Sequence, residues 1–581
     1  MHFNKRLQII TILLLFAFLS YGIIITTHYH KIVKVSSDSF TDNPDISLNV
    51  PHSTSNIKLY YRTAMDCYFF LPSYASLDEY SIHFDDSRYQ ISIGNIPIYN
   101  NCFLQKLDIN TPYTLKVSDI TDRNINAISY TVTFMQSQNI PAVFISTSTG
   151  TIDNLNSSKD YKEPGEFVCI NADGKIDSYG FLDNIKGHGN SSYDEVNKKS
   201  FLITFNAATD VLSMGAAKKY ILQANAFDDT YLRNKIAYEY CRDLGISYTV
   251  DTEYIDLYFN GEYAGNYLLC EKVELGANRV DITDGYLIEK ILHDRIEETD
   301  QSFQVAGMQD FLIKNPNRIS DAELQSIEEY MNTIENLIKS CDSYQKYSNL
   351  QEYIDIESFI DMYLINAITN DIDSNIASTY YYITKDDSGL KLHAGPVWDY
   401  DNAWGRAERG YVATLNAYPT GYCEELFAIE YFRNSVIEKY NSLAYPLMGK
   451  YLSDYIPEYI ERISPSISMD AARWLDEGYH SPHYTDYETS VSYLNSYIYA
   501  RMEHLYDRLN YPERYYYILF TNTSRSAYRD TEYWIKKGES IPDEVVEEIK
   551  IHFQCKAFNY GNGKSFDFQN PITNDIIIYG K

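Results

Sequence analysis

The chain lacks an excess of basic residues. Lys and Arg number 49 against 80 Asp and Glu, which gives a net charge of −31 at neutral pH. Because nucleic acid and anionic lipid both bind basic surfaces, this balance argues against either as the main partner. An acidic protein can still bind ATP where Mg²⁺ and a few basic side chains concentrate positive charge. The composition favours a basic protein as the macromolecular partner.

Cysteine motifs are also missing. The chain has eight cysteines but no C-x-x-C pair and no histidine at zinc-ligand spacing. This pattern argues against a dense disulfide framework and against a structural zinc site, although one or two disulfides remain open. The H-E-x-x-H, G-x-S-x-G and Walker motifs are absent as well, which argues against the hydrolases that carry them.

Long apolar runs are scarce, and one stands out at the N-terminus. Residues 7–27 follow Lys5 and Arg6 and contain 21 residues without a charge. A helix of this length crosses roughly 30 Å of hydrocarbon. Since residues 18–22 form a poor cleavage site, an uncleaved signal anchor is favoured over a cleaved signal peptide. No second run of this length occurs, so the rest of the chain is expected on the extracytoplasmic side.

The length of 581 residues suggests three or four domains, and the pattern predicts an α+β protein. Short alternating runs with turns between them predict an all-β sandwich early in the chain. A long mixed segment follows, and β character returns at the end. The expected parts are an anchor at 1–30, a linker at 31–54, the sandwich at 55–145, a mixed domain at 146–515 and a small β-rich domain at 530–581.

Several elements of the mixed segment are well marked. Asn260-Gly261 predicts a tight hairpin turn between strands at 254–259 and 263–270. Ser320 and Glu323 form a capping box at the start of a helix. Apolar spacing predicts further helices at 232–244 and 356–369, and short strands are expected at 380–384 and 390–393.

A glycine-rich segment precedes one of the predicted strands. Gly187, His188, Gly189, Asn190 and Ser191 run in sequence, and Lys198 and Lys199 follow. Glycines allow a backbone to approach phosphate oxygens, and successive N–H groups can cradle them. A lysine on the next strand could reach the same phosphates. The alternative is a tight surface turn.

Two groups of acids flank the strands at 380–384 and 390–393. Asp371, Asp373 and Asn375 come before them, and Asp399 and Asp401 come after. Such oxygens suit a hard cation or accept a hydroxyl proton, although helix-end and turn roles are the alternative. Because a hairpin returns its ends to one edge, Asp373 and Asp399 are predicted to be neighbours. That arrangement suits phosphoryl transfer.

The strand at 267–274 is a further candidate for nucleotide contact. A strand that leaves one lobe and enters another can offer its backbone groups to the edge of a purine. The alternative is an ordinary sheet strand.

A set of segments carries a family resemblance. IKGHGNSSY, KKSFLITF, DDTYLRNKIAYEY, FNGEYAGNYLLCEKVE, DIDSNIASTYYY and AGPVWDYDNAWG occur in order over roughly residues 140–510. In order and spacing this set resembles the spore coat protein H (CotH) kinase family. The resemblance implies an atypical, two-lobed protein-kinase-like core that uses ATP and Mg²⁺ or Mn²⁺ to phosphorylate Ser or Thr of a protein, often a basic secreted or spore coat protein.

The resemblance also implies roles for individual residues. Asp373 is similar to the catalytic acid of the family, with Asp371 as the alternative. Asp399 resembles the metal-binding acid, with Asp401 as a helper and Asn375 completing the metal shell. Lys199, or else Lys198, resembles the lysine that contacts ATP phosphates beside Gly187, Gly189, Asn190 and Ser191. Arg233 and Asn234 fall in the family's Leu-Arg-Asn segment, for which no role is derived, although Arg233 could orient an acid or a phosphate.

The flanking segments resemble other modules. The early β segment is similar to sandwich domains that precede such cores, and the tail resembles small β-grasp repeats of bacterial surface proteins. Two hypotheses follow. The first is a membrane-anchored kinase at the cell surface, or alternatively in the spore coat. The second is a non-catalytic surface adhesion or interaction protein that keeps a kinase-like scaffold.

Overall fold

The structure is a computed structural model. Several residues singled out from the sequence lie outside the part of the chain that it describes. It describes residues 43–51, 55–121, 127–306, 309–371, 377–387, 389–406, 412–416, 422–474, 486–522 and 531–580. The apolar run at 7–27, Asp373 and Asn375 lie outside these ranges. Within them, no helix has the length and apolar character that a bilayer crossing needs. The cysteines whose side chains are described are all free thiols.

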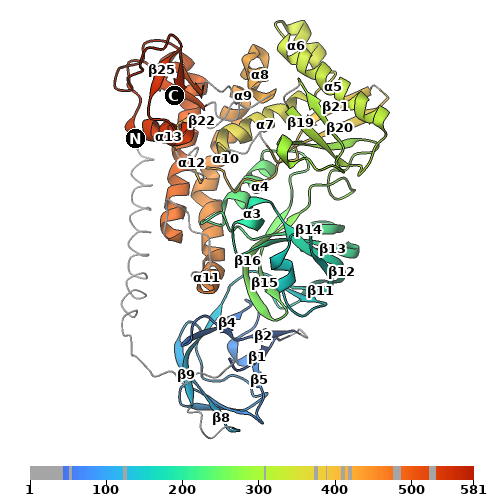
Figure 1. Ribbon diagram of the computed structural model, residues 1–581, viewed down its shortest axis with the longest axis vertical. Helices are drawn as coiled ribbons and strands as arrows, with labels where there is room; N and C mark the ends of the chain where they lie inside the picture. The colour runs from blue at the N-terminus through green and yellow to red at the C-terminus, as the bar shows by residue number, and fades with distance from the viewer. Residues whose placement is uncertain are drawn as a thin grey trace.

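Two sheets form the first part of the described chain, at the bottom of Figure 1. The smaller has the order β2-β1-β5 and the larger β3-β4-β9-β8-β6-β7. Buried side chains of both belong to one apolar core. The elements are β1 (Ile46–Asn49), β2 (Asn56–Lys58), β3 (Tyr60–Tyr61), β4 (Asp66–Leu71), η1 (Leu77–Glu79), β5 (Ser81–Phe84), β6 (Tyr89–Ile93), β7 (Ile96–Ile98), β8 (Pro112–Asp119) and β9 (Ile128–Gln136).

A closed barrel follows, with the order β10-β11-β12-β13-β14-β16-β15. It closes because β10 pairs in parallel with β15. The predicted hairpin turn is present, with positive φ at Asn260 and Gly261. The elements are β10 (Ala142–Thr147), α2 (Asp153–Ser157), β11 (Lys162–Ile170), β12 (Ile176–His188), α3 (Ser191–Asp194), β13 (Ser200–Thr209), β14 (Ala217–Gln223), α4 (Arg233–Asp243), β15 (Thr252–Phe259) and β16 (Glu262–Glu271).

Beyond the barrel, a sheet of order β18-β19-β17-β20-β21 packs with helices. The capping box at Ser320 and Glu323 is present. The first elements are β17 (Tyr286–Ile291), η2 (His293–Arg295), β18 (Ser302–Val305), β19 (Gln309–Asn315), α5 (Asp321–Lys339), α6 (Tyr344–Leu350), α7 (Ile356–Thr369), β20 (Thr379–Asp386) and β21 (Gly389–Ala394).

The later helices share the core of this part, together with α4. Two of the segments between them, η3 and η4, are π-helical. The elements are α8 (Tyr422–Ala428), α9 (Glu430–Lys439), η3 (Tyr440–Ala444), α10 (Tyr445–Lys450), η4 (Tyr451–Tyr455), α11 (Ile456–Trp474), α12 (Tyr487–Asn510) and η5 (Pro512–Arg514).

The C-terminal sheet has the order β22-β24-β23-β26-β25 and lies at the upper left of Figure 1. Its central pair, β23 and β26, is parallel, and α13 contributes to the same core. Strand β23 lies before the expected domain start at 530. The elements are β22 (Leu415–Asn416), β23 (Tyr515–Asn522), β24 (Thr531–Lys536), α13 (Asp543–Phe553), β25 (Phe558–Tyr560) and β26 (Ile576–Gly580).

Helix α11 connects three parts of the fold. It runs down from the helical part along the barrel toward the N-terminal sheets (Figure 1). Met469 lies in the core of those sheets, and the Tyr60 hydroxyl donates to the Arg473 carbonyl at 3.1 Å. On its barrel side, Asp470 accepts from the backbone N–H of Asn266 at 2.7 Å. The whole arrangement is a mixed α+β fold.

Candidate active site

The segment after β21, which carries Asp399, is held by helix α4. The backbone N–H of Tyr400 donates to the Asn234 Oδ1 at 2.8 Å, and the N–H of Asp399 donates to the Tyr238 hydroxyl at 3.1 Å. Trp398 stacks on the Tyr238 ring, with the ring centroids 5.8 Å apart. The backbone of Asp399 has a φ of +71°, which is uncommon for residues other than glycine and is tolerated best by Asn and Asp.

Arg233 fixes the same segment from the other side. Its Nε donates to the Ala403 carbonyl at 2.8 Å, and its guanidinium forms a buried ion pair with Asp228. From the sequence, the Leu-Arg-Asn segment had no derived role beyond the possibility that Arg233 orients an acid or a phosphate. In the structure, Arg233 and Asn234 both hold the backbone that presents Asp399.

The end of α7 is tied to this segment. Asn370 caps the helix in the left-handed conformation, and its Nδ2 donates to the Leu415 carbonyl at 2.8 Å and to the Tyr497 hydroxyl at 2.9 Å. The buried Trp404 donates from its backbone to the Thr369 carbonyl at 2.7 Å. The chain before β20 and the chain after β21 are therefore fixed to each other.

Asp371 and Asp399 line one small cavity, together with Asn366 and Tyr380. Asp371 is 5 % exposed. Burial, with the negative charges of Glu289 and Asp399 nearby, holds the pKa of Tyr380 well above its usual value. Asp401 follows two residues after Asp399 and is not among the residues that line this cavity. The hairpin β20–β21 thus brings Asp371 and Asp399, acids from its two ends, to one cavity. The predicted pair was Asp373 and Asp399, and Asp373 lies outside the described residues.

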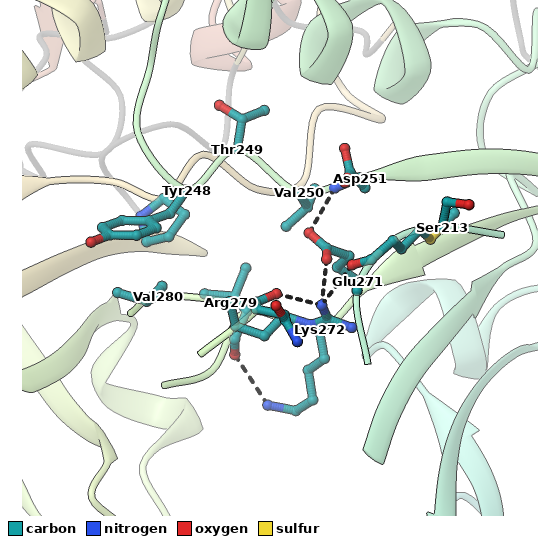
Figure 2. Close-up of a pocket in the computed structure, with 14 residues that line it drawn as sticks. Ser213, Tyr248, Thr249, Val250, Asp251, Glu271, Lys272, Arg279 and Val280 are labelled. Atoms are coloured by element: carbon teal, nitrogen blue, oxygen red, sulfur yellow. Dashed lines mark hydrogen bonds and ion pairs between the residues drawn. The ribbon is translucent and has the colours of Figure 1, made fainter. Parts of the chain in front are cut away.

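A larger cavity of about 320 Å³ adjoins the small one, because Pro396 lines both. Figure 2 shows its lining, which includes Glu271 at the end of β16 and Asp251, Lys272 and Arg279 from the adjoining loops. Glu271 accepts from the backbone N–H of Asp251 at 2.8 Å and pairs with Arg279. Burial outweighs these partners and raises the pKa of Glu271 to about 7.

Three lysines form ion pairs near the end of β16, where Lys272 follows the last strand residue, Glu271. Lys272 lies 4.0 Å from Glu274, Lys219 of β14 lies 3.1 Å from the same carboxylate, and Lys314 of β19 pairs with Glu289 at 2.7 Å. Burial lowers the pKa of Lys272 to about 8. The sequence analysis did not select these lysines, although Lys272 stands in the strand it proposed for purine contact.

The predicted phosphate lysines have other contacts. Lys198 is buried, lies 2.7 Å from Asp470 and donates to the Asn266 carbonyl at 2.6 Å. Lys199 donates to the Tyr193 carbonyl and lies over the Tyr193 ring. Neither residue lines the two cavities. Lys198 therefore joins the barrel to α11.

The glycine-rich segment ends β12 and begins α3. A Cβ at Gly187 would lie 2.3 Å from the Tyr193 ring, and Gly189 has a φ of +92°. Asn190 accepts from the Lys159 ammonium at 2.7 Å, while Ser191 begins α3. His188 has its pKa lowered to about 3 by burial and by the nearby charge of Lys272 and other lysines. Gly187 thus leaves room for the Tyr193 ring, and Gly189 supplies the positive φ that the turn needs.

The donor set of the small cavity suits a divalent cation. Asp371 and Asp399 supply carboxylate oxygens, which Mg²⁺ and Mn²⁺ prefer. No group of three or more His, Cys, Asp or Glu side chains is assembled for a metal among the residues that the structure describes. The residues therefore fit a cation held by two carboxylates, with its remaining ligands supplied by water and phosphate.

Two acids therefore line the small cavity, and Lys272 lines the larger cavity that adjoins it. A family model described as CotH kinase protein matches residues 185–505, which is more than half of the chain, and the chain belongs to this family. Membership supports a kinase-type function. A search of curated proteins found no match.

Proposed function

We propose that the chain transfers the γ-phosphate of ATP to a Ser or Thr hydroxyl of a basic protein, with Mg²⁺ or Mn²⁺ as cofactor. The observation that carries the proposal is the shared cavity of Asp371 and Asp399. Membership of the CotH kinase family supports the reaction class. The net charge of −31 supports a basic substrate.

The two adjoining cavities suggest how the nucleotide lies. The larger cavity has room for a purine, and Pro396 links it to the acids. Lys272 lines the larger cavity, and Lys219 lies beside the same Glu274 carboxylate. We assign the phosphate contact to Lys272, which lines the larger cavity, in place of Lys199 and Lys198, which line neither cavity.

The acids supply the rest of the chemistry. Asp399 and Asp371 would hold the cation, with Asp401 and Asn375 as further candidates, and a bound divalent cation neutralises charge on the phosphates. Asp373, with Asp371 as the alternative, accepts the proton of the acceptor hydroxyl. The new bond joins the acceptor oxygen to the γ-phosphorus as the bond from that phosphorus to the ADP oxygen breaks. The N-terminal run at 7–27 would anchor this activity at the membrane.

The test is phosphate transfer by the purified chain. Wild-type protein with labelled ATP, Mn²⁺ or Mg²⁺ and a basic acceptor protein should incorporate label. Asp399→Asn and Asp373→Asn should each reduce incorporation at least about 100-fold, since each removes a group that acts in the transition state. Asp454→Asn, at an exposed position on η4, is the matched control and should retain full activity.

Two results would contradict phosphate transfer by this chain. If wild-type protein incorporates no label under any metal condition, or if Asp399→Asn matches it, the non-catalytic interaction protein becomes the better hypothesis. A thermal shift with ATP and metal would then tell whether the scaffold still binds nucleotide.

A further inference from the structure

Asn366 is a buried amide in the small cavity that the sequence analysis did not select. It lies on α7 one turn before Asn370 and is 4 % exposed. It lines the cavity with Asp371 and Asp399. Its Nδ2 has no hydrogen-bond partner within the part of the chain that the structure describes.

Asn370, which caps the same helix, behaves differently, because its Nδ2 donates to the Leu415 carbonyl and the Tyr497 hydroxyl. Asn234 on α4 also has a buried Nδ2 with no partner among the described residues, but its Oδ1 accepts from the backbone of Tyr400 and it does not line the cavity. Since buried polar groups in proteins are almost always hydrogen-bonded, an unsatisfied Nδ2 in a cavity lined by the proposed catalytic acids points to a partner that arrives with a ligand.

The chemistry of the cavity selects the kind of ligand atom. An amide N–H needs an acceptor oxygen. The carboxylates of Asp371 and Asp399 line the cavity but do not bond to this Nδ2. Because these carboxylates repel a second anion, an anionic ligand binds beside them only together with a cation. A phosphoryl group that arrives with its metal brings both the cation and free oxygens.

We propose that Asn366 contacts the substrate directly, donating its Nδ2–H to an oxygen of the transferred phosphoryl group. This rests on the proposed phosphate transfer and adds a residue to its site. In the empty protein the amide is unsatisfied and destabilising, and in the complex it gains a hydrogen bond to a charged oxygen. Stability and function therefore oppose each other at this position.

Replacing Asn366 should therefore change stability and activity in opposite directions, which can be measured. Asn366→Leu keeps the approximate volume and removes the unsatisfied amide, so the melting temperature of the ligand-free protein should rise by about 2 °C or more. The same variant should lose about 10- to 100-fold in kcat/KM for labelled phosphate transfer. The stabilisation by ATP with Mn²⁺ should fall in parallel.

Asn266→Leu is the matched control for stability. The Oδ1 of this buried asparagine has no partner among the described residues, but its Nδ2 donates to the Ser466 hydroxyl at 2.9 Å. Because its replacement breaks that hydrogen bond, the melting temperature should fall. A structural role for Asn366 would give the same sign, a lower melting temperature, and that result would overturn the proposal. Undiminished turnover in Asn366→Leu would overturn it as well.

The two proposals fail in different ways. If wild-type protein transfers no phosphate but is stabilised by ATP with Mn²⁺, a weaker shift in Asn366→Leu supports the Asn366 contact while the transfer reaction is rejected. If ATP with Mn²⁺ gives no shift in wild-type protein, the Asn366 contact is rejected too.

Discussion

The Oδ1 of Asn234 accepts a hydrogen bond of 2.8 Å from the backbone N–H of Tyr400, the residue that follows Asp399. Asn234 lies on α4, a helix between barrel strands β14 and β15. Because α4 belongs to the apolar core of the helical part, this hydrogen bond ties the backbone beside Asp399 to that core. Any movement of α4 would change the direction of the Asp399 carboxylate.

Loss of the Asn234 acceptor should reduce turnover more than substrate affinity. We expect Asn234→Leu to lower kcat about 10- to 100-fold, as is typical when a group that orients a ligating side chain is removed. Asn234→Asp keeps the acceptor oxygen and should retain more activity. Steady-state kinetics with ATP and a basic acceptor checks this, and a Leu variant as active as wild type would contradict it.

Lys198 and Lys272 should give opposite results. Lys198→Met leaves the Asp470 carboxylate buried without its cation, which should destabilise the protein by about 3–5 kcal/mol. Lys272→Met, at a half-buried position, should change stability little but weaken the thermal shift given by ATP with Mn²⁺. Melting curves with and without nucleotide separate the two.

The double variant Lys198→Met with Asp470→Asn is the control for the first lysine. It removes both charges and should recover part of the lost stability. A Lys198→Met protein that melts like wild type but no longer responds to nucleotide would instead assign Lys198 to phosphate binding, as the family resemblance allows.

The buried Glu271 should make stability fall with rising pH. Its pKa is raised to about 7 by burial, while an unfolded glutamate has a pKa near 4.3. Between these values the folded state binds more protons, so the free energy of unfolding should decrease with a slope of up to about 1.4 kcal/mol per pH unit. The stabilisation is complete below pH ~4.3 and lost above pH 7.

Glu271→Gln should flatten that slope. Asp256 and Asp361 also have pKa values raised to about 6, so they contribute with the same sign in both proteins. The difference between the urea-unfolding free energies of wild type and variant, from pH 5 to 8, isolates Glu271. An identical pH dependence in the two proteins would show that Glu271 stays ionised.

Local patterns predicted the elements well. The helix at 356–369 has the predicted bounds, and the capping box and the Asn-Gly turn are present. These features depend on residues close in sequence, where periodicity, caps and turn residues act directly. Because the hairpin β20–β21 is such a feature, the convergence of the acid segments at its two ends could be anticipated.

Contacts between distant residues could not be anticipated. Lys198 stands beside the glycine-rich segment in sequence, yet its carboxylate partner is Asp470 on α11. Closure of the barrel depends on the pairing of β10 with β15. Asn366 looked like one polar residue in an apolar helix, and only its place in the cavity distinguishes it. A single sequence contains no direct signal for such long-range pairings.

The closure of the barrel limits how the chain can be shortened. The family match starts at residue 185, within β12, whereas β10 and β11 come before it. Trimming to the matched residues would strip β15 of its parallel neighbour and leave an open edge where another chain could add a strand. Removing the N-terminal sheets would expose Met469 and Tyr258 to water, because both side chains are buried in the core of those sheets. A fragment that keeps the barrel closed and these side chains covered should therefore begin before β1, which starts at Ile46, far upstream of the matched segment.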